Sequence, residues 1–372
     1  MKFLALILTS LVLFTSLAHG QEYCAFIFQP SLKFRPSQSW GRQAFEFEFQ
    51  RLENFFASTK NMPEEKRIQL MIKMDIRRRD LFQLQALSRL MTPQNKKFFA
   101  KQRLIFKDWE GTVSELDLST ALRETAEAIG EPSLVTHFQN REKAAIRAIV
   151  ADLKDAGLWD RPKETLNELR EKFKEKGDWL KGREEKQFLI ESLTKYAENL
   201  NKKIKAREFD DADIELGYHK LRRGLRWVLV QATALNGLIE LSHDKNISSS
   251  VDTWFSELKQ TDRKLFKGKF MKIAEPVVSE PLQIPREEFA IINHLVNEIG
   301  ITKDIAEQQI LFTEALKEMG ASDADIARVM TKLNAHFNSP VVDHQALSVD
   351  LQEKIEKTKL LHRYIEALQR MN

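Results

Sequence analysis

The chain of 372 residues has a single cysteine, Cys24, which excludes an internal disulfide bond. Glycine and proline are scarce, with 13 and 10 residues, and the sequence lacks the alternating pattern of β-branched residues that is typical of strands. A large excess of one charge is also missing, because the formal net charge is only +4. We therefore predict an all-α protein and expect no nucleic-acid partner.

Motifs of the common enzyme classes are absent. The sequence has no H-E-x-x-H pair, no glycine-rich phosphate loop and no G-x-S-x-G turn. His294 and Glu298 have the spacing of two zinc ligands, but no third ligand accompanies them, so a surface histidine is the favoured interpretation. We predict that the protein is not an enzyme, with no catalytic residues, no metal site and no cofactor.

The N-terminus has the three regions of a secretory signal peptide. Lys2 precedes the apolar run FLALILTSLVLF, and the small-residue site Ala18-His19-Gly20 follows it. The run is too short for a permanent membrane anchor and lacks a basic flank on its far side. We expect residues 1–20 to be removed and the mature protein, without a transmembrane segment, to be periplasmic or extracellular. Cys24 would then be a free thiol or an intermolecular link.

Residues 214–241 carry the strongest pattern in the chain. Apolar residues follow one another at alternating steps of four and three, which predicts one long buried helix. His219, Arg222 and Arg226 each follow a residue of this stripe and form a line about 100° away from it. Such a line is usually a solvated helix face. The alternative is that three donors, spaced by about one turn, bind a polyanion together.

The segment H-K-L-R-R-G-L-R-W within this stretch resembles the signature helix of the conserved histidine α-helical domain (CHAD) family. His219, Arg222 and Arg226 match the histidine of that signature and its basic positions at plus three and plus seven, and Trp227 stands where an aromatic residue is common. The resemblance implies an all-helical fold of two similar halves that face each other across a basic channel. It also implies binding of inorganic polyphosphate.

Residues 63–91 are the candidate for the corresponding helix of the first half. Pro63 and two glutamates predict the helix start. Arg77 lies in the apolar line of this helix, so it must snorkel, pair with a carboxylate or face a wet cavity that holds an anion. Lys73, Arg77 and Arg78 would form the matching basic ridge, although this copy has no histidine.

The halves are predicted at 21–206 and 207–372. The first would include one long, charged and exposed helix over 161–206, bent near Gly177 or Gly182. Three prolines predict an extended connector at 275–287 in the second. Further helices are predicted at 94–108, 114–130, 133–156, 251–273, 287–299, 303–319, 323–337 and 347–371.

Together these patterns predict an exported, CHAD-like helical bundle with an internal repeat that holds polyphosphate, or another polyanion, in a basic channel between its halves. Lys264, Lys267 and Lys269 would extend the channel wall. The main alternative is a periplasmic helical scaffold without an anion site that binds another envelope protein. Binding of anionic lipids or cell-wall polymers by the same residues is a third hypothesis. The full set of predicted anion-binding residues is Lys73, Arg77, Arg78, His219, Arg222, Arg226, Lys264, Lys267 and Lys269.

Overall fold

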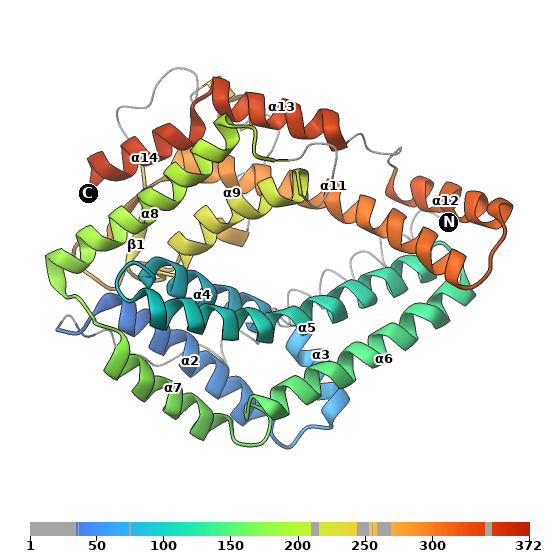
Figure 1. Cartoon of the computed structure of the whole chain (residues 1–372), viewed down its shortest axis with the longest axis horizontal. Coiled ribbons are helices and arrows are strands. Elements are labelled where there is room, and N and C mark those ends of the chain that lie inside the picture. The colour runs from blue at the N-terminus through green and yellow to red at the C-terminus, as the bar shows by residue number, and fades with distance from the viewer. Residues whose placement is uncertain are drawn as a thin grey trace, which may run out of the picture.

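The computed structural model describes residues 35, 37–73, 76–209, 216–243, 253–254, 256–258, 269–338 and 344–372. Within these ranges the chain is almost entirely helical, which confirms the predicted all-α class (Figure 1). None of the described helices is both long enough and apolar enough to cross a membrane. The expected signal peptide and Cys24 lie outside the described residues.

The first group of helices is built around an aromatic core. Phe45 and Phe49 belong to the apolar stripe of α2, and both are buried against Phe173 of α7, with ring centroids 4.5 and 5.4 Å away. The F-E-F-E-F run is therefore helical. Phe45 and Phe49 lie on one face of the helix and pack α2 against α7. The members of this group are α2 (Trp40–Thr59), α3 (Glu64–Lys73), α4 (Ile76–Met91), α5 (Lys96–Ala128), α6 (Pro132–Asp155) and α7 (Pro162–Lys176).

The second group forms around α9, which packs on α8, α11 and α13, while α14 packs on α8. Tyr218, Leu221, Leu225 and Val228 of the predicted apolar stripe are buried along α9. Burial of this stripe drives the association of α9 with its neighbours. The members are α8 (Gly182–Lys205), α9 (Tyr218–Thr233), α11 (Arg286–Glu318), α12 (Asp323–Phe337), α13 (His344–Lys357) and α14 (Leu360–Met371).

Several predicted helices have different boundaries in the structure. The helices predicted at 94–108 and 114–130 are the single helix α5, those at 287–299 and 303–319 are the single helix α11, and the one at 347–371 is divided into α13 and α14. The prediction of one exposed helix over 161–206 is wrong, because α7 ends at Lys176 and α8 begins at Gly182. Asp178, which lies between these two helices, has a positive φ angle of +47°, which the interior of a helix cannot contain. The helix predicted over 214–241 ends at Thr233, and Gly237, with φ +78°, turns the chain out of it.

A short parallel sheet follows this turn, although no strands were predicted. Strand β1 (Ile239–Ser242) pairs with β2 (Leu282–Pro285), and Ile239 lies opposite Leu282. Strand β2 lies in the proline-rich connector, where Pro281 and Pro285 prevent a helix and favour extended backbone. Both Ile239 and Leu282 are fully buried, so the sheet closes one side of the main core.

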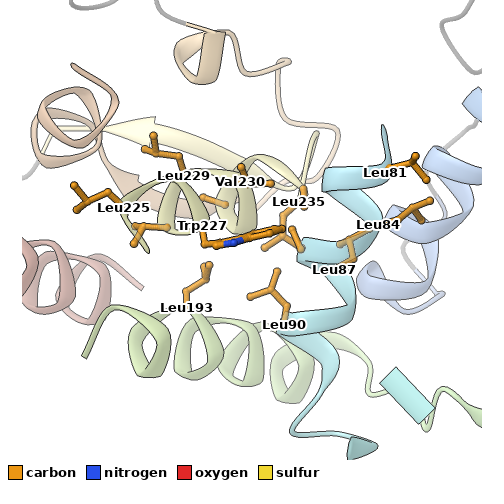
Figure 2. Close-up of a cluster of buried hydrophobic side chains, with 14 of the residues drawn as sticks. Leu81, Leu84, Leu87, Leu90, Leu193, Leu225, Trp227, Leu229, Val230 and Leu235 are labelled. Carbon is orange, nitrogen blue, oxygen red and sulfur yellow. The ribbon is translucent and has the colours of Figure 1, made fainter. Parts of the chain in front are cut away.

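The two groups meet first in the main core, where α4 packs on α8 and α9. The ring of Trp227 from α9 lies among Leu87 and Leu90 of α4 and Leu193 of α8 (Figure 2). Nearby, the buried carboxylate of Glu185 in α8 accepts hydrogen bonds of 2.6–2.8 Å from the Ser39 hydroxyl and from two backbone N–H groups at the start of α2. A side chain of the second group thus caps a helix of the first.

The groups meet a second time at the tips of two helical hairpins. Helices α5 and α6 form one hairpin and α11 and α12 the other, and both extend toward the same side (Figure 1). Phe138 of α6 and Phe312 of α11 lie in a separate small core with ring centroids 5.1 Å apart. Glu131 at the first tip forms ion pairs with Arg328 and Lys332 of α12. The hairpins are therefore joined at both ends.

Candidate anion-binding site

A cavity of about 840 Å³ lies between the two groups of helices. Helices α4 and α5 line one side of it, and α9 and α11 line the other. Among the described lining residues, nine are Lys or Arg and five are Asp or Glu, and His219 also contributes. The wall is therefore richer in positive than in negative charge.

Helix α9 brings three of the predicted residues to this cavity: His219, Arg222 and Arg226. They lie beside the buried stripe of α9, as the helical repeat requires. The structure does not describe the side chains of the other six predicted residues. Lys264 and Lys267 are outside the described residues. For Lys73, Arg77, Arg78 and Lys269 only the backbone is described, in α3, α4 and the short 3-10 helix η1 (Lys269–Met271).

The cavity is also lined by basic residues that the sequence patterns did not predict. Arg79 and Arg89 come from α4, Arg103 and Lys107 from α5, and Arg223 from α9. Arg223 directly follows Arg222 in the same motif, but the plus-three spacing favoured its neighbour. The sequence offered a weak signal for α4, because Arg79 continues the run of three arginines at 77–79.

Arg89 is the most unusual of these residues. Its guanidinium carbon lies 4.3 Å from the ring centre of Trp227, and its buried Nε has no hydrogen-bond partner. Burial lowers the pKa of Arg89 to about 10, and repulsion by Arg103 and Arg223 adds to this, while Tyr196 opposes it. Arg89 therefore remains charged at neutral pH, in a place where its charge is unfavourable.

Aromatic rings hold two guanidinium groups at the cavity wall. Arg226 lies over the ring of Phe82 at 4.6 Å, as Arg89 does over Trp227. The rings of Phe82 and Trp227 are themselves in edge contact, with centroids 5.8 Å apart. Stacking restricts the planes of both guanidinium groups.

Tyr196 of α8 lies behind this cluster. Its hydroxyl donates a long hydrogen bond of 3.4 Å to the carbonyl oxygen of Gly224 in α9. Burial raises the pKa of Tyr196 to about 12, although the charges of Arg89, Arg223 and Arg226 act in the opposite direction. The phenol stays neutral at physiological pH and does not neutralise the arginines.

Arg222 has a structural contact in addition to its place on the cavity wall. Its Nε donates a 3.1 Å hydrogen bond to the carbonyl oxygen of Val296 in α11. The guanidinium crosses α11 at Gly300, where an added Cβ would lie 2.5 Å from Nη2. Glycine is needed at this position for the close approach, and Arg222 joins α9 to α11.

Carboxylates line the cavity farther along α5 and α11 toward the hairpin tips. They include Glu110 and Asp117 of α5 and Asp304 of α11. Glu307 of α11 forms an ion pair with Lys303 at 2.5 Å. Within the described residues, no group of three or more His, Cys, Asp or Glu could hold a metal ion. The cavity thus has one strongly basic portion and one mixed portion.

The chemistry available in the basic portion is the binding of oxyanions. Guanidinium edges donate pairs of parallel hydrogen bonds that fit phosphate and carboxylate oxygens. Comparisons of the chain with models of protein families, with curated proteins and with solved structures found no match in any of the three.

Proposed function

We propose that the protein binds polyphosphate, or another polyanion of similar charge density, in the cavity between the two groups of helices. The observation that carries this proposal is the cluster of Arg89, Arg103 and Arg223. Within the described part of the chain, none of the three forms an ion pair with a carboxylate. Arg89 and Arg103 are partly buried, and Arg103 and the exposed Arg223 both repel Arg89. This repulsion is unfavourable in the empty protein, and a bound anion would relieve that cost.

The two groups of helices support the view that the protein consists of two related halves. Helices α5 and α11 each have 33 residues. Helix α4 comes before α5 in the chain and α9 comes before α11, and both α4 and α9 have 16 residues. Helix α2 packs on α4 and α7, and α8 packs in the same manner on α9 and α14. On this assignment the boundary falls before α8, so the charged segment 182–205 belongs to the second half rather than to the first.

Related halves would also explain why basic residues of two different helices line the same cavity. Arg89 of α4 and Arg226 of α9 occupy equivalent helices and face the same cavity. Convergence of both helices on one cavity favours anion binding over the scaffold hypothesis, in which the basic residues would be dispersed over the outer surface. The CHAD-like signature at His219, Arg222 and Arg226 agrees with this proposal. We further propose that residues 1–20 direct export, so that the ligand is met outside the cytoplasm.

Binding of medium-length polyphosphate should weaken steeply as salt rises, because each arginine contact releases condensed counterions. By analogy with single-stranded nucleic acid, three or four such contacts predict a loss of roughly 10- to 100-fold in affinity between about 50 and about 200 mM salt. Titration calorimetry of the mature protein at several salt concentrations measures this. Affinity that is the same at both salt concentrations, or no binding at either, would contradict the proposed function.

A further inference from the structure

We infer that the cavity captures the end of a polyphosphate chain, with Arg89, Arg103 and Arg223 forming a subsite for one terminal phosphoryl group. This inference rests on the proposed function and adds which part of the ligand is recognised. The chain would enter the cavity by its end rather than pass through from one side to the other.

The arrangement of the three arginines suits the binding of one small ligand group, such as a single phosphoryl group. They come from three different helices, α4, α5 and α9, and all three line the cavity. Arg103 and Arg223 lie near enough to Arg89 for their charges to repel it. The plane of Arg89 is fixed by stacking on Trp227, and its Nε is buried without a partner. Donors that approach from three helices can surround a tetrahedral group with several terminal oxygens.

The charge of the rest of the cavity argues against a chain that passes through it. On α5, Asp117 lies about 21 Å farther along the helix axis than Arg103. Asp304 and Glu307 line the cavity from α11, where Lys303 is already paired with both of them. An anionic chain extended along this path would approach these carboxylates, whereas a chain end held by Arg89, Arg103 and Arg223 would stay farther from Asp117 along α5.

The charge of the ligand also favours binding of the chain end over binding of an internal phosphate. A phosphoryl group with a free end carries about −1.5 to −2 charges at neutral pH, whereas an internal phosphate of a chain carries about one. Attraction to three guanidinium groups grows with the charge of the ligand and is strengthened by partial burial. The lowered pKa of Arg89 agrees with this, since a dianion offsets the repulsion from Arg103 and Arg223.

A comparison of linear and cyclic phosphates tests the inference. Linear tripolyphosphate has two ends, whereas trimetaphosphate and tetrametaphosphate are rings without ends, and the larger ring carries four charges. We expect tripolyphosphate to bind at least about 10-fold more tightly than either ring, in calorimetric titrations at one salt concentration. ATP keeps one free end and should bind more tightly than the rings. Tighter binding of ATP than of tripolyphosphate would overturn the assignment to an inorganic chain.

Two variants show whether the preference arises at the arginine cluster. Arg89→Met should reduce the affinity for tripolyphosphate to that for the rings. Lys107→Met, about one helical turn beyond Arg103 on the cavity wall, should weaken linear and cyclic ligands by similar factors. Rings that bind as tightly as tripolyphosphate would overturn the end-capture inference and leave the proposed function intact. If neither tripolyphosphate, the rings nor longer polyphosphate bound to the protein, the proposed function itself would be wrong.

Discussion

Replacing Arg89 by methionine is expected to weaken polyphosphate binding by about 100-fold while leaving the melting temperature of the empty protein unchanged or raised. A pair of charge-assisted hydrogen bonds contributes on the order of 3 kcal/mol to binding, which corresponds to this factor. Without ligand, the charge of Arg89 is opposed by burial and by Arg103 and Arg223. Methionine keeps an apolar stem against Trp227 and removes that charge. A loss of function with a gain in stability is typical of a binding site.

The control for this variant is Lys174→Met on α7, which removes the same charge from an exposed side chain that does not line the cavity. Its affinity for polyphosphate should change by less than about twofold at physiological salt. Thermal melting and calorimetry of the wild type, Arg89→Met and Lys174→Met separate the effect on stability from the effect on binding. A lower melting temperature for Arg89→Met, together with unchanged polyphosphate affinity, would assign Arg89 a structural role instead.

The second large effect is expected at a buried carboxyl pair behind the cavity wall. Glu48 of α2 and Asp80 of α4 are 4% and 0% exposed, and the Nε of Arg51 donates a 2.9 Å hydrogen bond to Asp80. Burial raises the pKa of Glu48 to about 8, repulsion by Asp80 adds to this, and Arg51 and Arg79 oppose it. The pKa of Asp80 is raised by burial as well. The pair therefore holds a proton at neutral pH.

This proton makes the stability of the protein depend on pH. The folded protein binds it between about pH 4.5, the ordinary pKa of a glutamate, and about pH 8, whereas the unfolded chain does not. The stabilisation is thus fully present below about pH 4.5 and is lost as pH rises through about 8, with a slope of up to about 1.4 kcal/mol per pH unit. Glu48→Gln cannot ionise, so its melting temperature should exceed that of the wild type progressively as pH rises from about 5 to about 9.

Asp80→Asn is the matched variant, because it removes the nearer of the two carboxylates that pair with Arg51, at 2.9 Å against 3.7 Å for Glu48. We expect it to lower the melting temperature across the whole pH range. If Glu48→Gln and the wild type lost stability in parallel as pH rose, the carboxyl pair would not be the source of the pH dependence.

The helical class and the inward faces of the main helices could be predicted from the sequence because they depend on local periodicity. The α2 stripe at Phe45 and Phe49 and the α9 stripe at Leu221 and Leu225 are all buried. Some helix ends were harder to predict. Gly111 and Gly300 lie inside α5 and α11 rather than at helix ends, since packing against neighbouring helices outweighs the roughly 1 kcal/mol cost of an internal glycine.

The candidate site could be predicted only on the helix that carries a motif. His219, Arg222 and Arg226 follow a repeat within one segment, and that repeat sets their common direction. Arg89 and Arg103 are separated in sequence from that motif by more than a hundred residues. Their approach to Arg223 depends on the packing of α4, α5 and α9, for which a single sequence has no local signal. The stacking of Arg89 on Trp227 likewise depends on how α4 packs against α9.

The most direct measurement is a crystal structure of residues 21–372 grown with tripolyphosphate. Replacement of tripolyphosphate with tungstate checks the anion position, because the anomalous signal of tungsten locates the anion. The proposed function predicts density for a phosphoryl group within hydrogen-bond distance of Arg89, Arg103 and Arg223, between α4, α5 and α9. Ordered anion only on the outer surface, with the arginine cluster occupied by water alone, would contradict it.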